Sequence, residues 1–178
     1  EINKVCSTLN ELPSTWVRVI DHSIREELES FSIKMFNISK KITYFQIRSI
    51  NKFIRTNLET KKIIVQSPGS GLAVKLLDIK SNEKVIDTCA APGGKSHAII
   101  QHFKKNNTLI CNEINNKRNN LLVDSLYHYK NYFNIINTSK DASIKSFPFA
   151  DKIFIDVPCS SSGTVQKNPD IKWKKINL

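Results

Sequence analysis

The sequence predicts an α/β fold: a Rossmann-like sheet of parallel strands, preceded by a small α+β lobe. From residue 83 onward, strand-like and helix-like segments alternate at short intervals, which favours right-handed βαβ units. Segments such as "KIFIDV" are apolar almost throughout, as expected for strands that are covered on both faces. A pair of glycines follows the first of these strands, where an open parallel sheet binds its ligands.

Residues 1–80 are predicted to form the lobe. Apolar residues recur at steps of three and four between residues 13 and 36, which predicts one long helix, and Pro13 and Ser14 are its start signals. The residues on the apolar face are Trp16, Ile20, Ile24, Leu28, Phe31 and Met35. The segments "ITYFQIRSI" and "KKIIVQS" then predict strands.

Residues 81–178 are predicted to form the Rossmann-like domain. Its expected strands are "EKVIDT", "TLICNE", "FNIINTS" and "DKIFIDV", and its expected helices are "KSHAIIQHFKK" and "NNKRNNLLVDSLYHYK". All five glycines, at positions 69, 71, 93, 94 and 163, are predicted to lie in loops. A doubly wound sheet usually has more than four strands, so we expect the sequence to be a fragment, truncated after the fourth.

Composition limits the possible classes of protein. The net charge of +11 and the pI of about 9.6 suggest a polyanionic partner such as nucleic acid. The bland alternative is genome composition, since lysine, asparagine and isoleucine all have AT-rich codons. No stretch is long enough to span a membrane, and the N-terminus lacks a signal pattern. The four cysteines show no metal-type or redox-type spacing, so we expect a reduced, cytoplasmic protein without a metal.

The stretch "DTCAAPGGKS" at residues 87–96 is the first candidate ligand site. Its glycines let backbone N–H groups approach a ligand, and the N-terminus of the following helix favours an anion such as a carboxylate. The alternative is a plain turn between strand and helix. The pattern is not G-x-G-x-x-G, and no glycine stands at position 89 to make a P-loop, so dinucleotides and nucleoside triphosphates are disfavoured.

Two acidic residues follow the next two strands. Glu113 can accept hydrogen bonds from the hydroxyls of a ribose, and Asp141 can accept from the amino group of adenine. The alternative is that each caps a helix. Together with the glycine loop, the two acids favour a ligand that contains adenosine.

The fourth strand ends in "IDVPCSSSG". Asp156 ends the strand, Pro158 stiffens the turn, and Cys159 stands at the turn's tip, where a cysteine is a candidate for chemistry. Cys6, Cys89 and Cys111 lie in or beside apolar segments, where packing in the core is the simpler interpretation.

These motifs resemble those of a known family. "DTCAAPGGKS", "CNE", "KDAS", "DVPCSSSG" and "NPDIKW", in this order and spacing, are similar to the Sun family of RNA (cytosine-5)-methyltransferases, and most of all to its bacterial members that act on 16S ribosomal RNA. The resemblance is clear from residue 66 to residue 173 and fainter upstream. It implies S-adenosyl-L-methionine as the cofactor, ribosomal RNA as the partner and methylation of cytosine at carbon 5.

The resemblance also implies roles for individual residues. Glu113 would hold the ribose, although the family usually has aspartate there, Asp141 would hold the adenine, and Asp156 would lie between the cofactor and the target base. The loop at the methionine end of the cofactor would consist of Cys89, Ala90, Ala91, Pro92, Gly93, Gly94 and Lys95.

The resemblance leaves the catalytic nucleophile open. In this family the cysteine of the Pro-Cys turn, here Cys159, assists product release, whereas the nucleophile lies in a later Thr-Cys-Ser turn that these residues do not contain. We therefore expect cofactor binding without turnover. One alternative is a non-catalytic remnant that binds RNA and cofactor. Another is that Cys159 attacks the base itself. Methylation of exocyclic amino groups is disfavoured, because "DVPCS" has a cysteine where such enzymes have an aromatic residue.

The segment "QKNPDIKWKK" is a candidate RNA contact. Lys167, Lys172 and Lys174 surround Trp173, and lysines follow phosphates while an exposed tryptophan stacks on a base. The alternative is that the tryptophan packs against the lobe.

Overall fold

The protein is described by a computed structural model, which covers residues 2, 7, 14–144, 146–159 and 170. The chain divides into two compact units. One unit is Thr15–Val157 and contains both sheets, and the other combines residues 1–14 with residues 158–178. The predicted domain boundary at residue 80 lies inside the first unit and stays a prediction.

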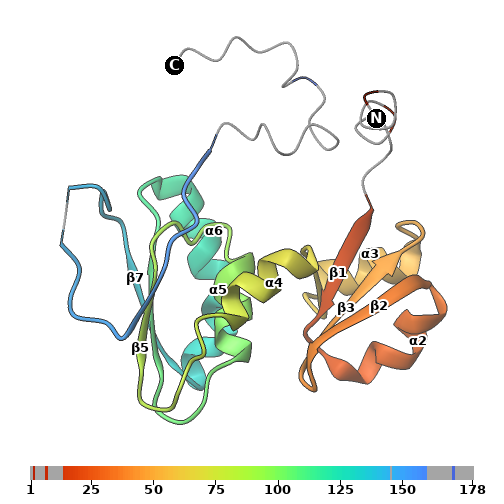
Figure 1. The fold of residues 1–178 in the computed structure, drawn as a ribbon, viewed down its shortest axis with the longest axis horizontal. Coiled ribbons are helices and arrows are strands. Elements are labelled where there is room, and N and C mark those ends of the chain that lie inside the picture. The colour runs from red at the N-terminus through yellow and green to blue at the C-terminus, as the bar shows by residue number, and fades with distance from the viewer. Residues whose placement is uncertain (1, 3–6, 8–13, 145, 160–169, 171–178) are drawn as a thin grey trace. The chain divides into compact units, whose positions relative to one another are not determined.

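The first sheet is antiparallel and has the strand order β2-β3-β1-β4 (Figure 1). Its strands are β1 (Thr15–Val19), β2 (Ser32–Ser39), β3 (Ile42–Ile47) and β4 (Ile63–Val65), and its helical segments are η1 (His22–Ile24), α2 (Arg25–Ser30) and α3 (Lys52–Glu59). Val17, Val19, Phe45 and Ile47 from the strands pack on Leu28 and Ile54 from the helices. The predicted strands "ITYFQIRSI" and "KKIIVQS" are confirmed.

The predicted long helix between residues 13 and 36 is wrong. Only Arg25–Ser30 is α-helical, and strands β1 and β2 flank it. Asp21 ends the extended segment, because its carboxylate accepts a hydrogen bond from the Ser23 N–H and caps η1. The apolar spacing of three and four therefore came from residues that belong to four separate elements, β1, η1, α2 and β2, and to the turns between them. Pro13 lies outside the described residues.

The second sheet is parallel and has the strand order β7-β6-β5-β8. Its strands are β5 (Lys84–Asp87), β6 (Thr108–Asn112), β7 (Asn134–Thr138) and β8 (Lys152–Phe154), with α5 (Gly94–Gln101), α6 (Asn116–Leu126) and η2 (Tyr127–Asn131) in the connections. The predicted Rossmann-like sheet is confirmed. The chain moves outward from β5 to β7 and then returns to the other side of β5, so the topological switch point lies between β5 and β8.

Helix α5 is the most deeply buried helix described, and it places the loop that precedes it. Ala98, Ile99 and Ile100 are each at most 3% exposed and pack in the main apolar cluster with Val85, Leu109 and Leu122. Because strand and helix are both fixed in the core, the connection between Asp87 and Gly94 has little freedom.

Three glycines that were predicted in loops lie in helices. Gly69 and Gly71 are in α4 (Pro68–Lys75), and Gly94 is the first residue of α5. Gly71 is needed because α4 crosses close to the antiparallel sheet: a Cβ atom there would collide with the Tyr44 hydroxyl and with Ile38 Cδ1. In the described part of the chain, no helix has the length and apolar character required to cross a bilayer.

Candidate functional site

The connection from β5 to α5 is a tight loop pinned to its neighbours. The Ala90 N–H donates to the Asn112 carbonyl at 2.8 Å, and the Gly93 N–H donates to the Ala90 carbonyl at 2.8 Å. Gly93 has a φ of 108°, and a Cβ atom there would collide with the Ser125 hydroxyl, so only glycine fits. The loop that contains Ala90, Ala91 and Pro92 therefore lies at the carboxyl end of β5, and its role in binding a ligand stays a prediction.

Glu113 follows β6 and is only 3% exposed. Its Oε1 accepts from the Asn115 N–H at 3.0 Å, and its Oε2 lies 3.4 Å from Arg118 Nη1. Arg118 Nη2 also donates to the Ala91 carbonyl at 2.7 Å, so one guanidinium joins the carboxylate to the glycine loop. The sequence reasoning missed Arg118. The sequence feature that could have identified Arg118 is its position in the first turn of α6, where the helix dipole disfavours a positive charge.

Asn112 links the loops after three strands. It is 1% exposed, its Nδ2 donates to the Thr88 and Lys140 carbonyls at 3.0 and 2.9 Å, and its Oδ1 accepts from the Thr138 hydroxyl at 2.8 Å. The sequence reasoning missed this residue also. A polar residue at the end of the apolar strand "TLICN" was the available signal.

Asp141 lies three residues beyond the end of β7, and its carboxylate serves a local turn. Oδ1 accepts from the Ser143 N–H at 2.9 Å and from the Ser143 hydroxyl at 2.6 Å. These two hydrogen bonds hold the pKa of Asp141 below its usual range. The backbone of Lys140, the residue before Asp141, forms two hydrogen bonds with the side chain of Asn112, the residue before Glu113. Asp141 and Glu113 therefore lie at the same edge of the sheet.

Lys95 and Asp156 form an ion pair, with Nζ and Oδ2 2.5 Å apart. Lys95 lies in the first turn of α5 and Asp156 lies two residues beyond β8. The ion pair therefore connects the segments that follow β5 and β8, the two strands beside the switch point.

Two further predictions concern the end of the chain. Cys159 is exposed and belongs to the other compact unit. The predicted RNA contacts Lys167, Lys172, Trp173 and Lys174 lie outside the described residues.

A buried polar group lies beneath the loop. Asp87 is 1% exposed, its Oδ2 accepts from the Ser96 hydroxyl at 2.7 Å, and among the described residues its Oδ1 has no hydrogen-bond partner. Burial raises the pKa of Asp87 to about 6, although the Ser96 hydrogen bond opposes the shift. Cys111 is fully buried beside Ser96, and burial raises the pKa of its thiol. The predicted core role of Cys111 is confirmed, whereas Cys89 is partly exposed.

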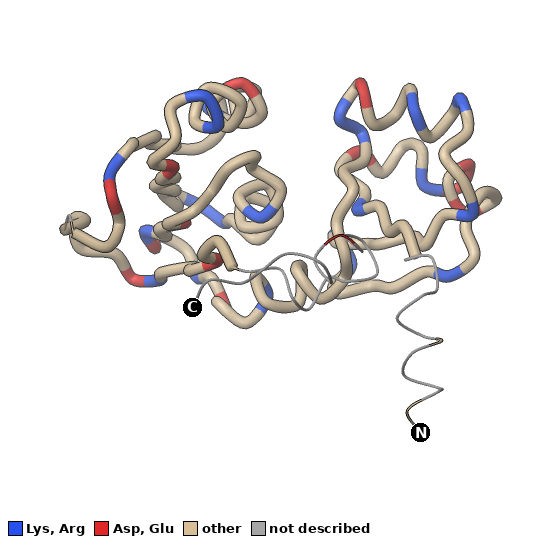
Figure 2. The backbone as a smooth tube through the Cα atoms, turned by 90° about the horizontal axis from the view of Figure 1, so that it is seen from above, with Lys and Arg blue, Asp and Glu red and all other residues tan. Residues whose placement is uncertain are grey.

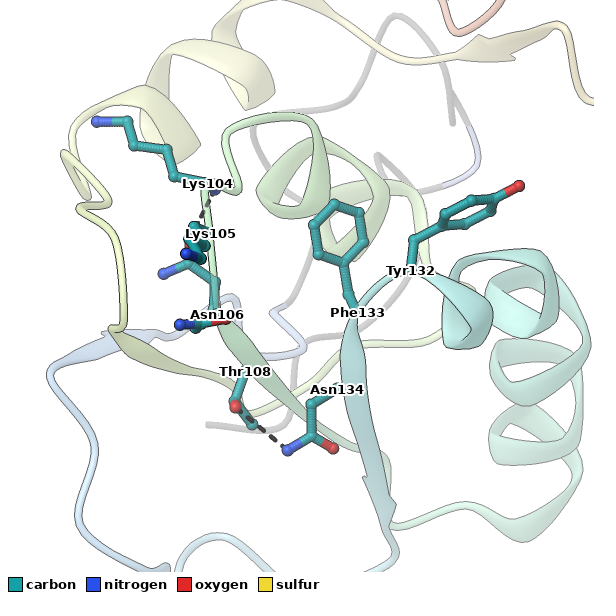
Figure 3. A pocket seen from close by; sticks show the side chains of 8 residues that line it. Lys104, Lys105, Asn106, Thr108, Tyr132, Phe133 and Asn134 are labelled. Carbon is teal, nitrogen blue, oxygen red and sulfur yellow. Dashed lines mark hydrogen bonds between the residues drawn. The ribbon is translucent and has the colours of Figure 1, made fainter.

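A separate cavity of about 530 Å³ opens at the amino ends of β6 and β7, the sheet edge opposite the glycine loop. Figure 3 shows Asn134 directed toward Thr108, with a hydrogen bond of 3.3 Å, whereas Tyr132 points away from both. No predicted site residue lines this cavity.

Figure 2 shows Lys and Arg spread along the whole described backbone with Asp and Glu between them, so the positive charge is not confined to one segment.

The described residues contain no group of three or more His, Cys, Asp or Glu side chains that could hold a metal ion. The polar side chains described at the carboxyl edge are instead the carboxylates of Glu113, Asp141 and Asp156. Carboxylate oxygens accept hydrogen bonds, so they suit an organic ligand that has hydroxyls.

Solved structures share this fold. The crystal structure of PH0851 superimposes with a TM-score of 0.75 at 27% identity, covering 96% of this chain and 41% of that one. NSun6 from Pyrococcus horikoshii, solved with SFG, superimposes with a TM-score of 0.62 at 16% identity, covering 89% of this chain and 67% of that one. These structures therefore share the mixed α/β fold with a Rossmann-like parallel sheet.

Curated proteins match as well. Ribosomal RNA small subunit methyltransferase B of Yersinia enterocolitica is 30% identical over 175 residues, covering 92% of this chain and 40% of its own length. The tRNA (cytosine(34)-C(5))-methyltransferase of Drosophila melanogaster is 36% identical over 123 residues, covering 58% of this chain and 16% of its own length. The chain thus spans two fifths or less of the length of these two relatives.

The family model that matches is described as 16S rRNA methyltransferase RsmB/F, and it covers residues 73–177. This range contains the glycine loop, Glu113 and the Lys95–Asp156 pair, and it is more than half of the chain. The protein belongs to the 16S rRNA methyltransferase RsmB/F family.

Proposed function

We propose that the protein binds S-adenosyl-L-methionine at the carboxyl edge of its parallel sheet and serves the methylation of cytosine at carbon 5 in small-subunit ribosomal RNA. The observation that carries the proposal is the position of the glycine loop at the switch point, with the buried carboxylate of Glu113 beside it, in a chain of this family. Methylation of small-subunit ribosomal RNA comes from the names of the bacterial relatives, and cytosine carbon 5 comes from the name of the Drosophila relative and from the resemblance of the motifs. The cytoplasm is the compartment that we predict.

The residues present fit this cofactor. Gly93 lets the loop pack tightly against Ser125 of α6, and the small side chains of Ala90 and Ala91 keep the loop narrow. Glu113 offers buried carboxylate oxygens at the end of β6, which is where this fold accepts hydrogen bonds from ribose hydroxyls. Asp141 is the proposed contact for the adenine, and the N-terminus of α5 is the proposed contact for the carboxylate of the methionine part.

The bound cofactor would supply an electrophilic methyl group. The protein's own residues would orient it: Glu113 from the ribose side, and the loop Cys89–Lys95 from the methionine side. Asp156 pairs with Lys95 two residues beyond β8. The family resemblance implies that Asp156 lies between the cofactor and the target base. Carbon 5 of cytosine is a poor nucleophile, and a thiolate that adds to carbon 6 makes it reactive.

Binding can be tested by titrating S-adenosylhomocysteine, the demethylated cofactor, into the protein in a calorimeter. Wild-type protein should bind, and Glu113→Gln should bind more weakly because it loses one charge toward the ribose hydroxyls. Asp124→Asn is the matched control, since Asp124 is an exposed acid on α6. Absence of binding to the wild type, or equal binding by Glu113→Gln, would contradict the proposed site.

A second candidate is a protein that binds cofactor and RNA without turning over. A radiolabelled methyl-transfer assay on small-subunit ribosomal RNA distinguishes the two, because repeated turnover would exclude the second candidate. RNA that contains 5-fluorocytosine tests Cys159 as nucleophile: a covalent adduct that disappears in Cys159→Ala would assign the attack to this thiol, and no adduct with wild type would reject it.

A further inference from the structure

Arg18 joins the antiparallel sheet to the helix that follows the glycine loop. It lies in β1 and is 0% exposed. Its Nη2 donates to the Gly94 carbonyl at 3.0 Å, and its Nη1 donates to Gln101 Oε1. Gly94 and Gln101 are the first and last residues of α5 and lie two turns apart on one helix face, so a single guanidinium contacts the helix at both ends.

A second side chain reaches the same carbonyl. Gln66 Nε2 donates to the Gly94 carbonyl at 3.0 Å, and Gln66 is itself fixed by the Tyr44 hydroxyl, which donates to its Oε1 at 2.9 Å. Gln101 Nε2 returns a hydrogen bond of 3.0 Å to the Val19 carbonyl. Arg18 from β1 and Gln66, the residue after β4, thus converge on the Gly94 carbonyl at the start of α5, and Tyr44 from β3 holds Gln66 in place.

Stability alone does not account for this arrangement. In the described part of the chain Arg18 has no carboxylate partner, and its buried Nε has no hydrogen-bond partner. Burial lowers the pKa of Arg18 to about 10, so the side chain remains charged at neutral pH. A buried cation without an anion is costly, and the N-terminus of a helix disfavours it further. An apolar residue of similar size would remove both costs but would lose the hold on Gly94.

We propose that Arg18 and Gln66 are positioning residues for the cofactor loop: by fixing the Gly94 carbonyl, they set the orientation of the loop N–H groups that face the ligand. The inference rests on the proposed function, because the ligand is the cofactor proposed above. It gives the antiparallel sheet a part in cofactor binding that is separate from any contact with RNA.

The test compares Arg18→Met and Arg18→Lys with wild-type protein, by calorimetry with S-adenosylhomocysteine and by hydrogen exchange of the amides of residues 93–96. Arg18→Met should weaken binding about tenfold, since hydrogen bonds from a charged donor are among the stronger ones. Arg18→Lys should lose less affinity, because an ammonium can keep one hydrogen bond to the Gly94 carbonyl. The loop amides should exchange faster in both variants, and most in Arg18→Met.

Two controls separate positioning from general destabilisation. Arg48→Met removes an exposed arginine just beyond β3, and Ile63→Val loosens the core of the antiparallel sheet without touching α5. Neither should change affinity or loop exchange. An Arg18→Met variant that binds like wild type, or an Ile63→Val variant that loses as much affinity, would overturn the proposal. If wild-type protein binds no S-adenosylhomocysteine, the proposed function fails, and loop exchange alone decides whether Arg18 holds the loop.

Discussion

Lys95 Nζ lies 2.5 Å from Asp156 Oδ2, which ties the start of α5 to the chain just beyond β8. The two side chains are 31% and 49% exposed, so water screens the pair and its contribution to folding is small. Its importance is geometric: it joins the two strands that flank the switch point, where we place the cofactor.

Breaking this pair should affect binding more than stability. In Asp156→Asn we expect several-fold weaker binding of S-adenosylhomocysteine and a loss of unfolding free energy of no more than about 1 kcal/mol. Asp78→Asn breaks the exposed Lys80–Asp78 pair, which has a separation of 2.6 Å, and serves as the control that changes neither quantity much. Calorimetry measures the affinity, and urea unfolding measures the unfolding free energy. A large stability loss with unchanged affinity would show that the pair is only structural.

Replacing each of two glycines in α4 by alanine should change the stability of the protein in opposite directions. Gly71→Ala drives a methyl group into Tyr44 and Ile38, so it should destabilise the protein by about 1–3 kcal/mol. Gly69→Ala meets nothing within 4 Å and should stabilise it by about 0.5–1 kcal/mol, as alanine does in helices. Urea unfolding of both variants decides. A neutral Gly71→Ala would mean that α4 does not approach β3 this closely.

Asp87 predicts a pH dependence of stability. Its folded-state pKa is raised from 3.8 to about 6, chiefly by burial, so the folded protein binds the proton more tightly than the unfolded chain. Its contribution to stability is therefore greatest below pH 4 and declines as the pH rises to about 6. Relative to Asp87→Asn, the unfolding free energy of the wild type should fall by up to about 3 kcal/mol between pH 4 and pH 6 and should not change further above pH 6. Urea unfolding between pH 4 and pH 7 gives the difference, and a constant difference would place the pKa of Asp87 near its ordinary value.

The cysteines should differ in their reaction with iodoacetamide. Cys111 is 0% exposed and the pKa of its thiol is raised, so it should react only after unfolding in urea. Cys89 is partly exposed in the proposed cofactor loop and should react in the native protein, more slowly with S-adenosylhomocysteine present. Mass spectrometry of labelled peptides follows both sites. Labelling of Cys89 that ignores a bound ligand would remove it from the cofactor site.

The basic segment near the C-terminus should contribute to RNA binding through phosphates. Reversing the charge of Lys167, Lys172 and Lys174 should weaken binding and lower the slope of log affinity against log salt by about two, at roughly 0.7 per phosphate contact with single strands. Reversing three exposed lysines of the β2–β3 hairpin, Lys34, Lys40 and Lys41, is the matched control. Filter binding at several salt concentrations measures the slopes, and equal slopes for the two variants would remove the tail's special role.

The parallel sheet could be predicted from sequence because its two central strands, β5 and β6, are buried at nearly every position and are mostly apolar. The expectation that "KIFIDV" is covered on both faces was wrong, since Ile153 and Ile155 are more than half exposed. In the antiparallel sheet β3 and β4 could be predicted, but β1 and β2 could not. The spacing within residues 13–36 satisfied a helical pattern, and the residues that pair with these strands, such as Ile47 opposite Thr15 in β1, lie farther along the chain. Arg18 shows the same limit, because the carbonyl that it contacts is 76 positions away. Glu113 and the loop were found because each is adjacent to its own strand, whereas Arg118 and Asn112 act across strands.

The strand order also sets the sequence of events during synthesis. Strands β5, β6 and β7 can pair in the order in which they leave the ribosome, but β8 must return to β5, and Thr88 bonds to the Phe154 carbonyl 66 residues later. At typical translation rates that interval lasts roughly 3–13 s. For that time the nascent chain presents the open flank of β5 as an unpaired edge, where chaperones or a misplaced strand could bind.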